Sequence, residues 1–384
     1  MNSDKQYRIA LVLYTQGLDY DDRIRKEILT IQNLFSNVSF HIFAVEANNR
    51  EEEGGTSYGI PYRIPYLKSR DQFASGTHTL IKAWDFYQSI KKDLKRFDVI
   101  WCADVETFLF VLLTRKKPIV WDLHELPNRF LVNGMMKKLF NCLESRCSVM
   151  IHANEQRLQY LIDKGYIRHQ ERNFVLRNYP QFNEIDTDYD ETYQHFDDWL
   201  GDSKCAYLQG INGQDRADIE SLEAILSVEG LKGVVVGYTR PELLSLLEEK
   251  HSQEELRTRL YFTGRVKQLK TPQYIKRCIF GMVFYKNTCM NNWYCEANRF
   301  FQNIINGNPV IVGQNPSLKE TVNDYHLGVV AETDGSNSKA IHEAIMELLS
   351  RYDYYKENVN ENKDNWLWNQ QEPIVREIVN KMLS

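Results

Sequence analysis

The chain has 384 residues, which at roughly 150 residues per domain predicts two domains. Lysine and arginine total 47 against 52 aspartate and glutamate residues, so the formal net charge is −5, and hydrophobic residues make up 43%. This composition excludes a disordered chain and argues against a dedicated nucleic-acid-binding protein, which would usually be basic. Because no stretch approaches the ~18 consecutive apolar residues of a membrane span, we expect a cytoplasmic protein.

The first half alternates short apolar runs with amphipathic segments. Residues 8–13 (RIALVL) are typical of a buried strand, and residues 22–35 place four apolar side chains on one helical face. Residues 46–75 are polar and are expected to form a loop with at most a short strand. The alternation predicts further strands at 39–45, 99–103, 119–122, 149–153 and 174–176, and helices at 80–96, 128–146 and 155–164. Apolar strands separated by helices indicate a parallel sheet that is covered on both faces.

The composition changes after this first half. Residues 181–204 are acidic and lack periodicity, which favours a linker between an N-terminal domain (1–180) and a second domain (205–352). A helical tail at 353–384 follows. Strands of the second domain are predicted at 206–209, 233–236, 260–263, 281–284, 310–312 and 328–331, and helices at 216–226, 241–249, 271–278, 296–305 and 338–350. Two α/β domains on either side of a hinge predict a ligand site in the cleft between them.

Common nucleotide and metal motifs are missing from the sequence. A dinucleotide-binding enzyme would carry G-x-G-x-x-G directly after a strand, and a P-loop enzyme would carry G-x-x-x-x-G-K-[ST]. Residues 14–19 (YTQGLD) contain one glycine, and residues 210–213 (GING) have the wrong spacing, so neither class fits. The seven cysteines form no C-x-x-C pair and the nine histidines no H-E-x-x-H motif. We therefore expect no metal site and no disulfide framework.

Glycines end several predicted strands of the second half, and arginines follow two of them. Gly210 precedes Arg216, and Gly264 directly precedes Arg265. Glycine lets a backbone N–H approach a ligand closely, and the start of a helix attracts phosphate. Ordinary strand ends and solvated arginines explain the same pattern about equally well, so these residues alone leave a diphosphate site and a purely structural role both open.

Longer segments carry a resemblance to a known family. In the second half they are 207–211 (YLQGI) followed by Arg216, then 261–266 (YFTGRV), and 298–311 (NRFFQNIINGNPVI), which is similar to N-K-L-F-E-Y-x-x-x-G-K-P-V-I. In the first half they are Asp22-Arg23-Ile24 with Lys26-Glu27, then 121–126 (WDLHEL) and 176–180 (LRNYP). With these segments the chain resembles GT-B glycosyltransferases, in particular the retaining glycosyltransferase family 4.

The resemblance implies an α/β fold of two Rossmann-like domains that face each other across a cleft, with a C-terminal helix crossing back to the first domain. It also implies transfer of a sugar, with retention and without a metal or cofactor, from a nucleotide-diphosphate sugar to a glycan or lipid-linked acceptor in cell-surface polysaccharide synthesis. The implied catalytic residues are His124, close to the transferred sugar, and Arg216, which binds phosphate. The implied donor-binding residues are Gly210, Arg216, Gly264, Arg265, Glu296, Asn298, Arg299 and Gln302. The implied acceptor-side residues are Gly17, Asp22, Arg23 and Glu125.

Two positions depart from the family pattern. Ile211 stands where a second phosphate-binding arginine is usual, so we expect Arg265 or Arg299 to supply that charge. Gln302 stands where the family has a glutamate that binds ribose hydroxyls, and the contact would therefore be neutral and weaker. Glu296 suits either a sugar contact or a helix cap. The departures at Ile211 and Gln302 motivate one alternative, a catalytically silent GT-B partner subunit. A sugar-nucleotide epimerase with a GT-B fold is kept as a second.

Basic clusters in the first half bear on the acceptor. They lie at 91–96, 115–117 and 135–140, and the last also contains apolar side chains. Together such clusters are consistent with transient contact with an anionic membrane surface, although any one of them is more often an ordinary solvated helix face. We therefore expect peripheral contact with the inner face of a membrane that carries a lipid-linked acceptor, and no nucleic-acid partner.

Overall fold

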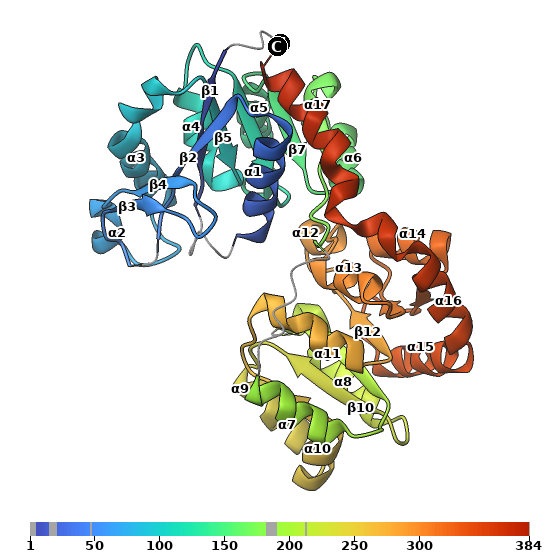
Figure 1. Ribbon diagram of the computed structural model, residues 1–384. Helices are drawn as coiled ribbons and strands as arrows, with labels where there is room; N and C mark the ends of the chain where they lie inside the picture. The colour runs from blue at the N-terminus through green and yellow to red at the C-terminus, as the bar shows by residue number, and fades with distance from the viewer. Residues whose placement is uncertain (1–4, 15–20, 47, 182–189, 212, 384) are drawn as a thin grey trace. The chain divides into compact units, whose positions relative to one another are not determined.

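The computed structural model describes residues 5–14, 21–46, 48–181, 190–211 and 213–383. The chain divides into two compact units, each an α/β domain with its own sheet (Figure 1). The first unit comprises Met1–Asn178 together with Gln371–Ser384, and the second comprises Tyr179–Gln370. The predicted class of fold, two Rossmann-like α/β domains, is confirmed.

The first unit is built on a mostly parallel sheet. Within the described residues this sheet has eight strands in the order β3-β4-β2-β1-β5-β6-β7-β8. The strands are β1 (Tyr7–Val12), β2 (Val38–Phe43), β3 (Glu52–Gly55), β4 (Pro61–Ile64), β5 (Val99–Ala103), β6 (Ile119–Leu123), β7 (Val149–His152) and β8 (Asn173–Val175). Neighbouring strands are parallel except for β3 and β4. The central strands are buried on both faces, which explains why they read as continuous apolar runs.

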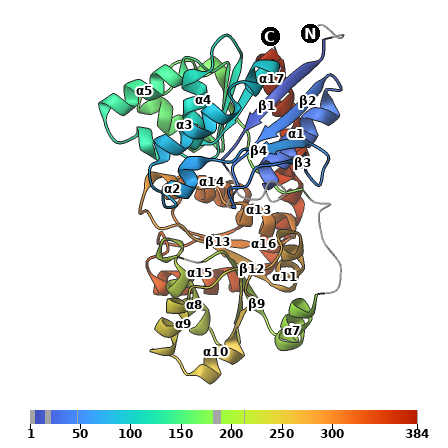
Figure 2. The same cartoon turned by 90° about the vertical axis from the view of Figure 1, so that its left-hand side faces the viewer.

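Helices cover both faces of this sheet. They are α1 (Asp22–Leu34), α2 (Lys68–Gln72), α3 (Thr79–Ile90), α4 (Phe108–Leu113), α5 (Gly134–Glu144), α6 (Glu155–Asp163) and α17 (Glu372–Leu383). Figure 2 shows α3, α4 and α5 on one side of the sheet and α1 and α17 on the other. Helix α17 contacts α1, β7 and β8 and buries Val375, Ile378 and Val379. The C-terminal helix thus returns to the first unit, as expected.

Residues 46–75 are more structured than their polar sequence predicts. They hold the antiparallel pair β3 and β4 and the short helix α2, and β4 extends the sheet beside β2. Every residue of β3 is exposed, so no apolar alternation marks it in the sequence. Arg63 on β4 forms ion pairs with Glu51 at 3.1 Å and Glu53 at 3.2 Å. This charged edge strand suits the border of a sheet, where charges oppose edge-to-edge aggregation.

The second unit has a fully parallel sheet. In the part of the chain that the structure describes, its six strands follow the order β11-β10-β9-β12-β13-β14. They are β9 (Cys205–Gln209), β10 (Lys232–Val236), β11 (Leu260–Phe262), β12 (Phe280–Val283), β13 (Val310–Val312) and β14 (Gly328–Val330). Strand β9 shows how both faces are covered, because Ala206 and Leu208 belong to one apolar cluster while Cys205 and Tyr207 belong to another.

The helices of the second unit complete these clusters. They are α7 (Glu191–Leu200), α8 (Asp218–Leu226), α9 (Pro241–Glu248), α10 (Gln253–Arg259), α11 (Thr271–Arg277), α12 (Met290–Trp293), α13 (Asn298–Ile305), α14 (Pro316–Tyr325), α15 (Ser338–Ser350) and α16 (Tyr352–Asn362). Among the described residues, no helix has the length and apolar character needed to cross a membrane.

The boundaries of the two units differ from the expected ones. The linker predicted at 181–204 contains α7, whose buried Phe196 and Leu200 join an apolar cluster of the second unit. The acidic residues of α7 lie on its solvent side, and their number made the segment resemble a linker in the sequence. The tail predicted at 353–384 is split, because α16 belongs to the second unit and α17 to the first. Buried Trp366 anchors the segment between these two helices in the second unit.

Candidate active site

His124 lies at the carboxyl end of the first unit's sheet, one residue beyond β6. Its side chain is 22% exposed, and its Nε2 lies 3.1 Å from Oδ2 of Asp122. Asp122 is completely buried. Burial alone would lower the pKa of His124, but the negative charge of Asp122 raises this pKa to about 9. His124 is therefore a cation at neutral pH with both ring nitrogens as donors, and no described residue bonds to its Nδ1.

Asp122 is held from the other side by Arg23 of α1. The Arg23 guanidinium donates from Nη2 to Asp122 at 2.8 Å and from Nη1 to the carbonyl oxygen of Leu176 at 2.9 Å. Burial would raise the pKa of Asp122, but the charges of Arg23 and His124 keep it below its usual range. Glu27 lies 3.0 Å from Arg23, yet burial and the charge of Asp122 raise the pKa of Glu27 well above its ordinary value. The two buried carboxyl groups are therefore shifted in opposite directions: the cations favour the charged form of Asp122, while burial and the charge of Asp122 favour the protonated form of Glu27.

A second arginine fixes the backbone of His124. Arg157 of α6 is buried and donates from Nη1 to the carbonyl oxygen of His124 at 2.7 Å. The side chain of Asn154 caps α6 by accepting from the backbone N–H of Arg157 at 2.8 Å. Nothing in the sequence marks Arg157, because an arginine inside an amphipathic helix is usually solvated.

The predicted acceptor-side residues have different environments. Arg23 is only 5% exposed and its guanidinium is engaged by Asp122, so the expectation that it faces an acceptor does not fit the structure. Asp22 forms ion pairs within α1, to Arg25 at 2.7 Å and Lys26 at 2.7 Å. Glu125 is exposed. Gly17 lies outside the described residues.

In the second unit, Gly210 and Arg216 form a turn at the carboxyl end of β9. Gly210 has a φ of +59°, and Arg216 donates from Nη1 to its carbonyl oxygen at 2.9 Å. This is the one hydrogen bond that the Arg216 guanidinium makes in the described part of the chain, so its other side-chain N–H groups remain available to a ligand. Ile211 is buried in an apolar cluster, and its position therefore supplies no charge.

Arg299 of α13 is a structural counterpart to Arg216. Its side chain is 6% exposed, and it donates to the carbonyl oxygen of Phe284 at 3.1 Å and to that of Gln209. The guanidinium groups of Arg216 and Arg299 lie 5.3 Å and 4.8 Å from the ring centre of Tyr285. Tyr285, which the sequence did not single out, thus positions both cations. Because the Arg299 guanidinium already donates to backbone carbonyl oxygens, it is less suited than an unbonded arginine to be the second phosphate ligand.

Arg265 fits that second role better. It is exposed, and it makes no hydrogen bond or ion pair to the residues that the structure describes. Gly264, with a φ of +67°, accepts from the backbone N–H of Gly237 at 3.0 Å and so ties the ends of β10 and β11 together. Because the strands of this sheet are parallel, these turns share one edge with the turn at Gly210.

Helix α13 brings the remaining predicted donor residues to the same edge. Glu296 lies two residues before the helix and Asn298 begins it, and both are half-buried. Gln302 is 7% exposed, and its buried Oε1 has no hydrogen-bond partner among the described residues. A buried amide oxygen without a donor is costly, so this atom is suited to accept from a ligand hydroxyl. Across the described residues, no three His, Cys, Asp or Glu side chains are grouped so as to hold a metal ion.

Solved structures match the chain over nearly its whole length. Sucrose-phosphate synthase from Thermosynechococcus elongatus aligns with a TM-score of 0.75 at 12% identity, over 98% of this chain and 99% of that chain. Anabaena Alr3699/HepE in complex with UDP and glucose aligns with a TM-score of 0.72 at 12% identity, over 98% and 100%. The chain has the GT-B fold.

The same fold also occurs in another class of enzyme. A Listeria monocytogenes protein assigned as UDP-N-acetylglucosamine 2-epimerase aligns with a TM-score of 0.65 at 10% identity, over 98% of this chain and 97% of that chain. No protein-family model and no curated protein sequence matches the chain. These similarities establish the GT-B fold and do not single out family 4.

Proposed function

We propose that this protein is a retaining glycosyltransferase that moves a sugar from a nucleotide-diphosphate sugar to a glycan or lipid-linked acceptor. The observation that carries the proposal is the edge of the second sheet, where Arg216 keeps unused N–H groups beside the positive-φ turn at Gly210. A guanidinium with free donors next to close backbone is suited to bind the oxygens of a diphosphate. Arg265 on a neighbouring turn adds a second exposed cation.

The proposed roles follow from the available atoms. Arg216 and Arg265 stabilise the charge that develops on the departing diphosphate, without a metal ion. Gln302 accepts from a ribose hydroxyl through its unpartnered Oε1. Protonated His124 donates from Nδ1 to a hydroxyl of the transferred sugar, while Asp122 holds its other nitrogen. These groups act by fixed charge and orientation, so no further catalytic carboxylate is needed.

In the proposed reaction an acceptor oxygen replaces the diphosphate at the anomeric carbon of the sugar. The bond between this carbon and the diphosphate oxygen breaks, and its electron pair stays on the diphosphate. An acceptor hydroxyl oxygen forms the new bond to the same carbon, and the hydroxyl proton passes to the departing diphosphate oxygen. Protein cations lower the energy of this step mainly by neutralising the leaving group.

The identity of the donor is suggested by a protein of the same fold. HepE has been crystallised with UDP and glucose and with UDP-glucose. We therefore take UDP-glucose as the first donor to test, by isothermal titration calorimetry on the full chain. Binding that is lost in Arg216→Ala supports the proposal. Absence of binding for UDP-, GDP- and ADP-sugars alike would instead favour a catalytically silent subunit, for which Ile211 and Gln302 are the motivating departures.

An epimerase is the second candidate, because one of the matching structures is assigned that activity. An epimerase converts its sugar nucleotide without an acceptor, whereas a transferase changes the donor only by transfer or slow hydrolysis. Incubating the protein with each bound nucleotide sugar and separating the products by chromatography distinguishes the two. A new sugar nucleotide formed without acceptor would overturn the transferase proposal.

A further inference from the structure

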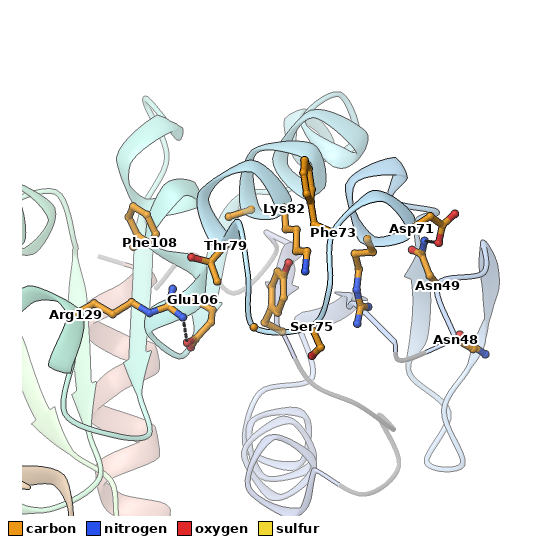
Figure 3. A pocket seen from close by; sticks show the side chains of 14 residues that line it. Asn48, Asn49, Asp71, Phe73, Ser75, Thr79, Lys82, Glu106, Phe108 and Arg129 are labelled. Atoms are coloured by element: carbon orange, nitrogen blue, oxygen red, sulfur yellow. Dashed lines mark hydrogen bonds and ion pairs between the residues drawn. The ribbon is translucent and has the colours of Figure 1, made fainter.

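A cavity of about 570 Å³ opens in the first unit (Figure 3). Its walls come from the segments that follow β1, β2, β4, β5 and β6, together with the first turn of α3. Because these five strands are parallel, the cavity lies at the carboxyl edge of the sheet, where open α/β sheets bind ligands. Its volume falls within the roughly 300–1,000 Å³ that is usual for small-molecule sites. The cavity is therefore large enough to hold a small polar molecule.

Lys82 on α3 brings a positive charge into the cavity. The residue is 7% exposed, and its Nζ donates to the carbonyl oxygen of Ala74 at 2.7 Å. Figure 3 shows its amino group pointing from α3 into the middle of the lining. Within the residues that the structure describes, Lys82 forms no ion pair with a carboxylate. A lysine this deeply buried is almost always paired with an anion, and two of its three N–H donors remain for one.

Two arginines add to this charge. Arg70 donates to the carbonyl oxygen of Glu46, which accepts the bond without cancelling the charge. Arg129 is 45% exposed and lies 3.5 Å from Glu106, and Figure 3 shows this pair at one end of the lining. Burial raises the pKa of Glu106 above its ordinary value, which favours its uncharged form. The charge of Arg129 is therefore only partly offset by Glu106.

The other carboxylate of the described lining lies away from this pair. Asp71 accepts hydrogen bonds from the Tyr66 hydroxyl and from the side-chain amide of Asn49 at 2.7 Å. Figure 3 shows Asp71 and Asn49 at the end of the cavity that is opposite to Arg129. Lys82 thus lies between the two carboxyl groups without being paired to either. The middle of the cavity is therefore suited to an anion.

The first turn of α3 contributes to the same wall. Thr79 begins this helix of 12 residues and lines the cavity. No described side chain caps the helix at His78, whose ring stacks instead on Phe73 with centres 4.1 Å apart. Because the N-terminal end of a helix carries a partial positive charge, this turn favours an anion beside Lys82.

The cavity shares a loop with the proposed transfer centre. His124 is the first residue after β6, and Arg129 follows it by five residues in the segment that reaches the cavity. The hydroxyl groups of Tyr14 and Thr79 also line the cavity, and hydroxyls of this kind can donate to or accept from those of a sugar. One loop therefore connects an anion site to the histidine that we propose contacts the transferred sugar.

We propose that the cavity selects an acceptor sugar that carries an anionic group, either a phosphate monoester or a carboxylate. Lys82 and Arg129 bind the oxygens of this group, and the first turn of α3 stabilises its charge. The anionic group does not react. A hydroxyl elsewhere on the same sugar forms the new bond to the anomeric carbon, and its proton passes to the departing diphosphate, so the product keeps the anionic group. The role as acceptor rests on the proposed transferase function, whereas the anion site does not.

The test is isothermal titration calorimetry of the full chain with three probes: glucose 6-phosphate, glucuronic acid and glucose. The galacto and manno forms of each probe guard against a wrong choice of sugar. We expect at least one anionic probe to bind at least about tenfold more tightly than its neutral counterpart, because hydrogen bonds to a charged group are about twice as strong as neutral ones. The tighter of the two anionic classes identifies the group. No preference over the neutral sugars would overturn the proposal.

Three variants locate the anionic group in the cavity. Lys82→Gln and Arg129→Gln should each reduce the preference for the anionic probe about tenfold, because each removes a charged donor. Thr79→Asp should reduce it as strongly, because the new carboxylate repels an anion, while the helix dipole favours an acidic residue at this position and so preserves the fold. Arg129 is 45% exposed, so the test stays decisive even if the buried Lys82 variant fails to fold.

Matched controls are Lys138→Gln on α5 and Arg96→Gln beyond the end of α3, both exposed and outside the cavity. Both should bind the anionic probe as the parent does. A preference that survives unchanged in Arg129→Gln and Thr79→Asp would overturn the proposal. UDP-glucose binding is measured separately on the parent. If UDP-glucose fails to bind while the anionic sugar binds, the donor assignment fails and the anion site stands.

Discussion

Oδ2 of the buried Asp122 lies 3.1 Å from Nε2 of His124, two residues further along the same strand end. The aspartate is also bonded to Arg23, so two cations share one carboxylate. Because a buried carboxylate keeps its charge only when it is paired, the imidazolium and the guanidinium hold it ionised, and it in turn holds them in place. His124 is thereby fixed as a cation with Nδ1 directed elsewhere.

The pKa of His124 should depend on Asp122. In Asp122→Asn the attracting charge is removed while burial remains, so the pKa of His124 should fall from about 9 to its ordinary value of 6.5 or below. Titration of the imidazole Cε1–H signal by NMR measures this. Glu125→Gln is the control, because it removes an exposed neighbouring carboxylate and should leave the midpoint near 9. An unchanged midpoint in Asp122→Asn would contradict the assigned pairing.

The free energy of unfolding should also depend on the protonation of His124. The folded pKa of His124 lies above its unfolded value of 6.5, so protonation of His124 stabilises the fold fully below about pH 6.5. That contribution is lost as the pH rises toward 9. The free energy of unfolding of the parent relative to His124→Gln should therefore decline between pH 6.5 and 9. Urea denaturation at three pH values across this window checks it, and a difference that grows with pH would refute it.

Substitution of the two arginines around Tyr285 should affect different properties of the protein. Arg216→Ala should reduce sugar transfer at least ~10²-fold, because it removes charge from the leaving diphosphate, with little change in the free energy of unfolding. Arg299→Ala should lower that free energy by about 2 kcal/mol or more, because the carbonyl oxygens of Gln209 and Phe284 lose their donors. Urea denaturation and transfer assays on both variants decide it. If both substitutions lowered the free energy of unfolding equally, the assignment of Arg299 as structural and Arg216 as ligand-binding would be wrong.

Gln302→Glu should lower the free energy of unfolding and raise the affinity for the nucleotide sugar. Without ligand, a buried carboxylate replaces an amide whose Oε1 has no partner, and the free energy of unfolding should fall by about 1–3 kcal/mol. With UDP-glucose, ribose hydroxyls should donate to the carboxylate and strengthen binding several-fold, since bonds to charged acceptors are about twice as strong. Gln268→Glu, at an exposed position, makes the same charge change as a control. If binding weakens instead, Gln302 is not at the ribose.

Much of the fold follows from local patterns. The buried central strands read as apolar runs, and the helices between them as amphipathic faces, so the parallel strands of both sheets were predictable. The edge strand β3 and helix α7 were missed, because the first is wholly exposed and the second presents an acidic outer side. An element that buries one face has apolar residues at regular intervals in its sequence. Elements at the border of a sheet bury little, so their sequences show little of this periodicity.

The site divides in the same way. The order of residues along the chain was enough to predict which residue types follow which strands, including His124 after β6 and Arg216 after β9. The folded chain was needed to show that Arg23 is buried against Asp122 and that Arg299 is bound by carbonyl oxygens while Arg216 keeps free donors. It was also needed to show that segments after five strands line one cavity. Periodicity reports burial along one element. The pairing of a charge depends on strand order, which brings together residues 99 positions apart such as Arg23 and Asp122.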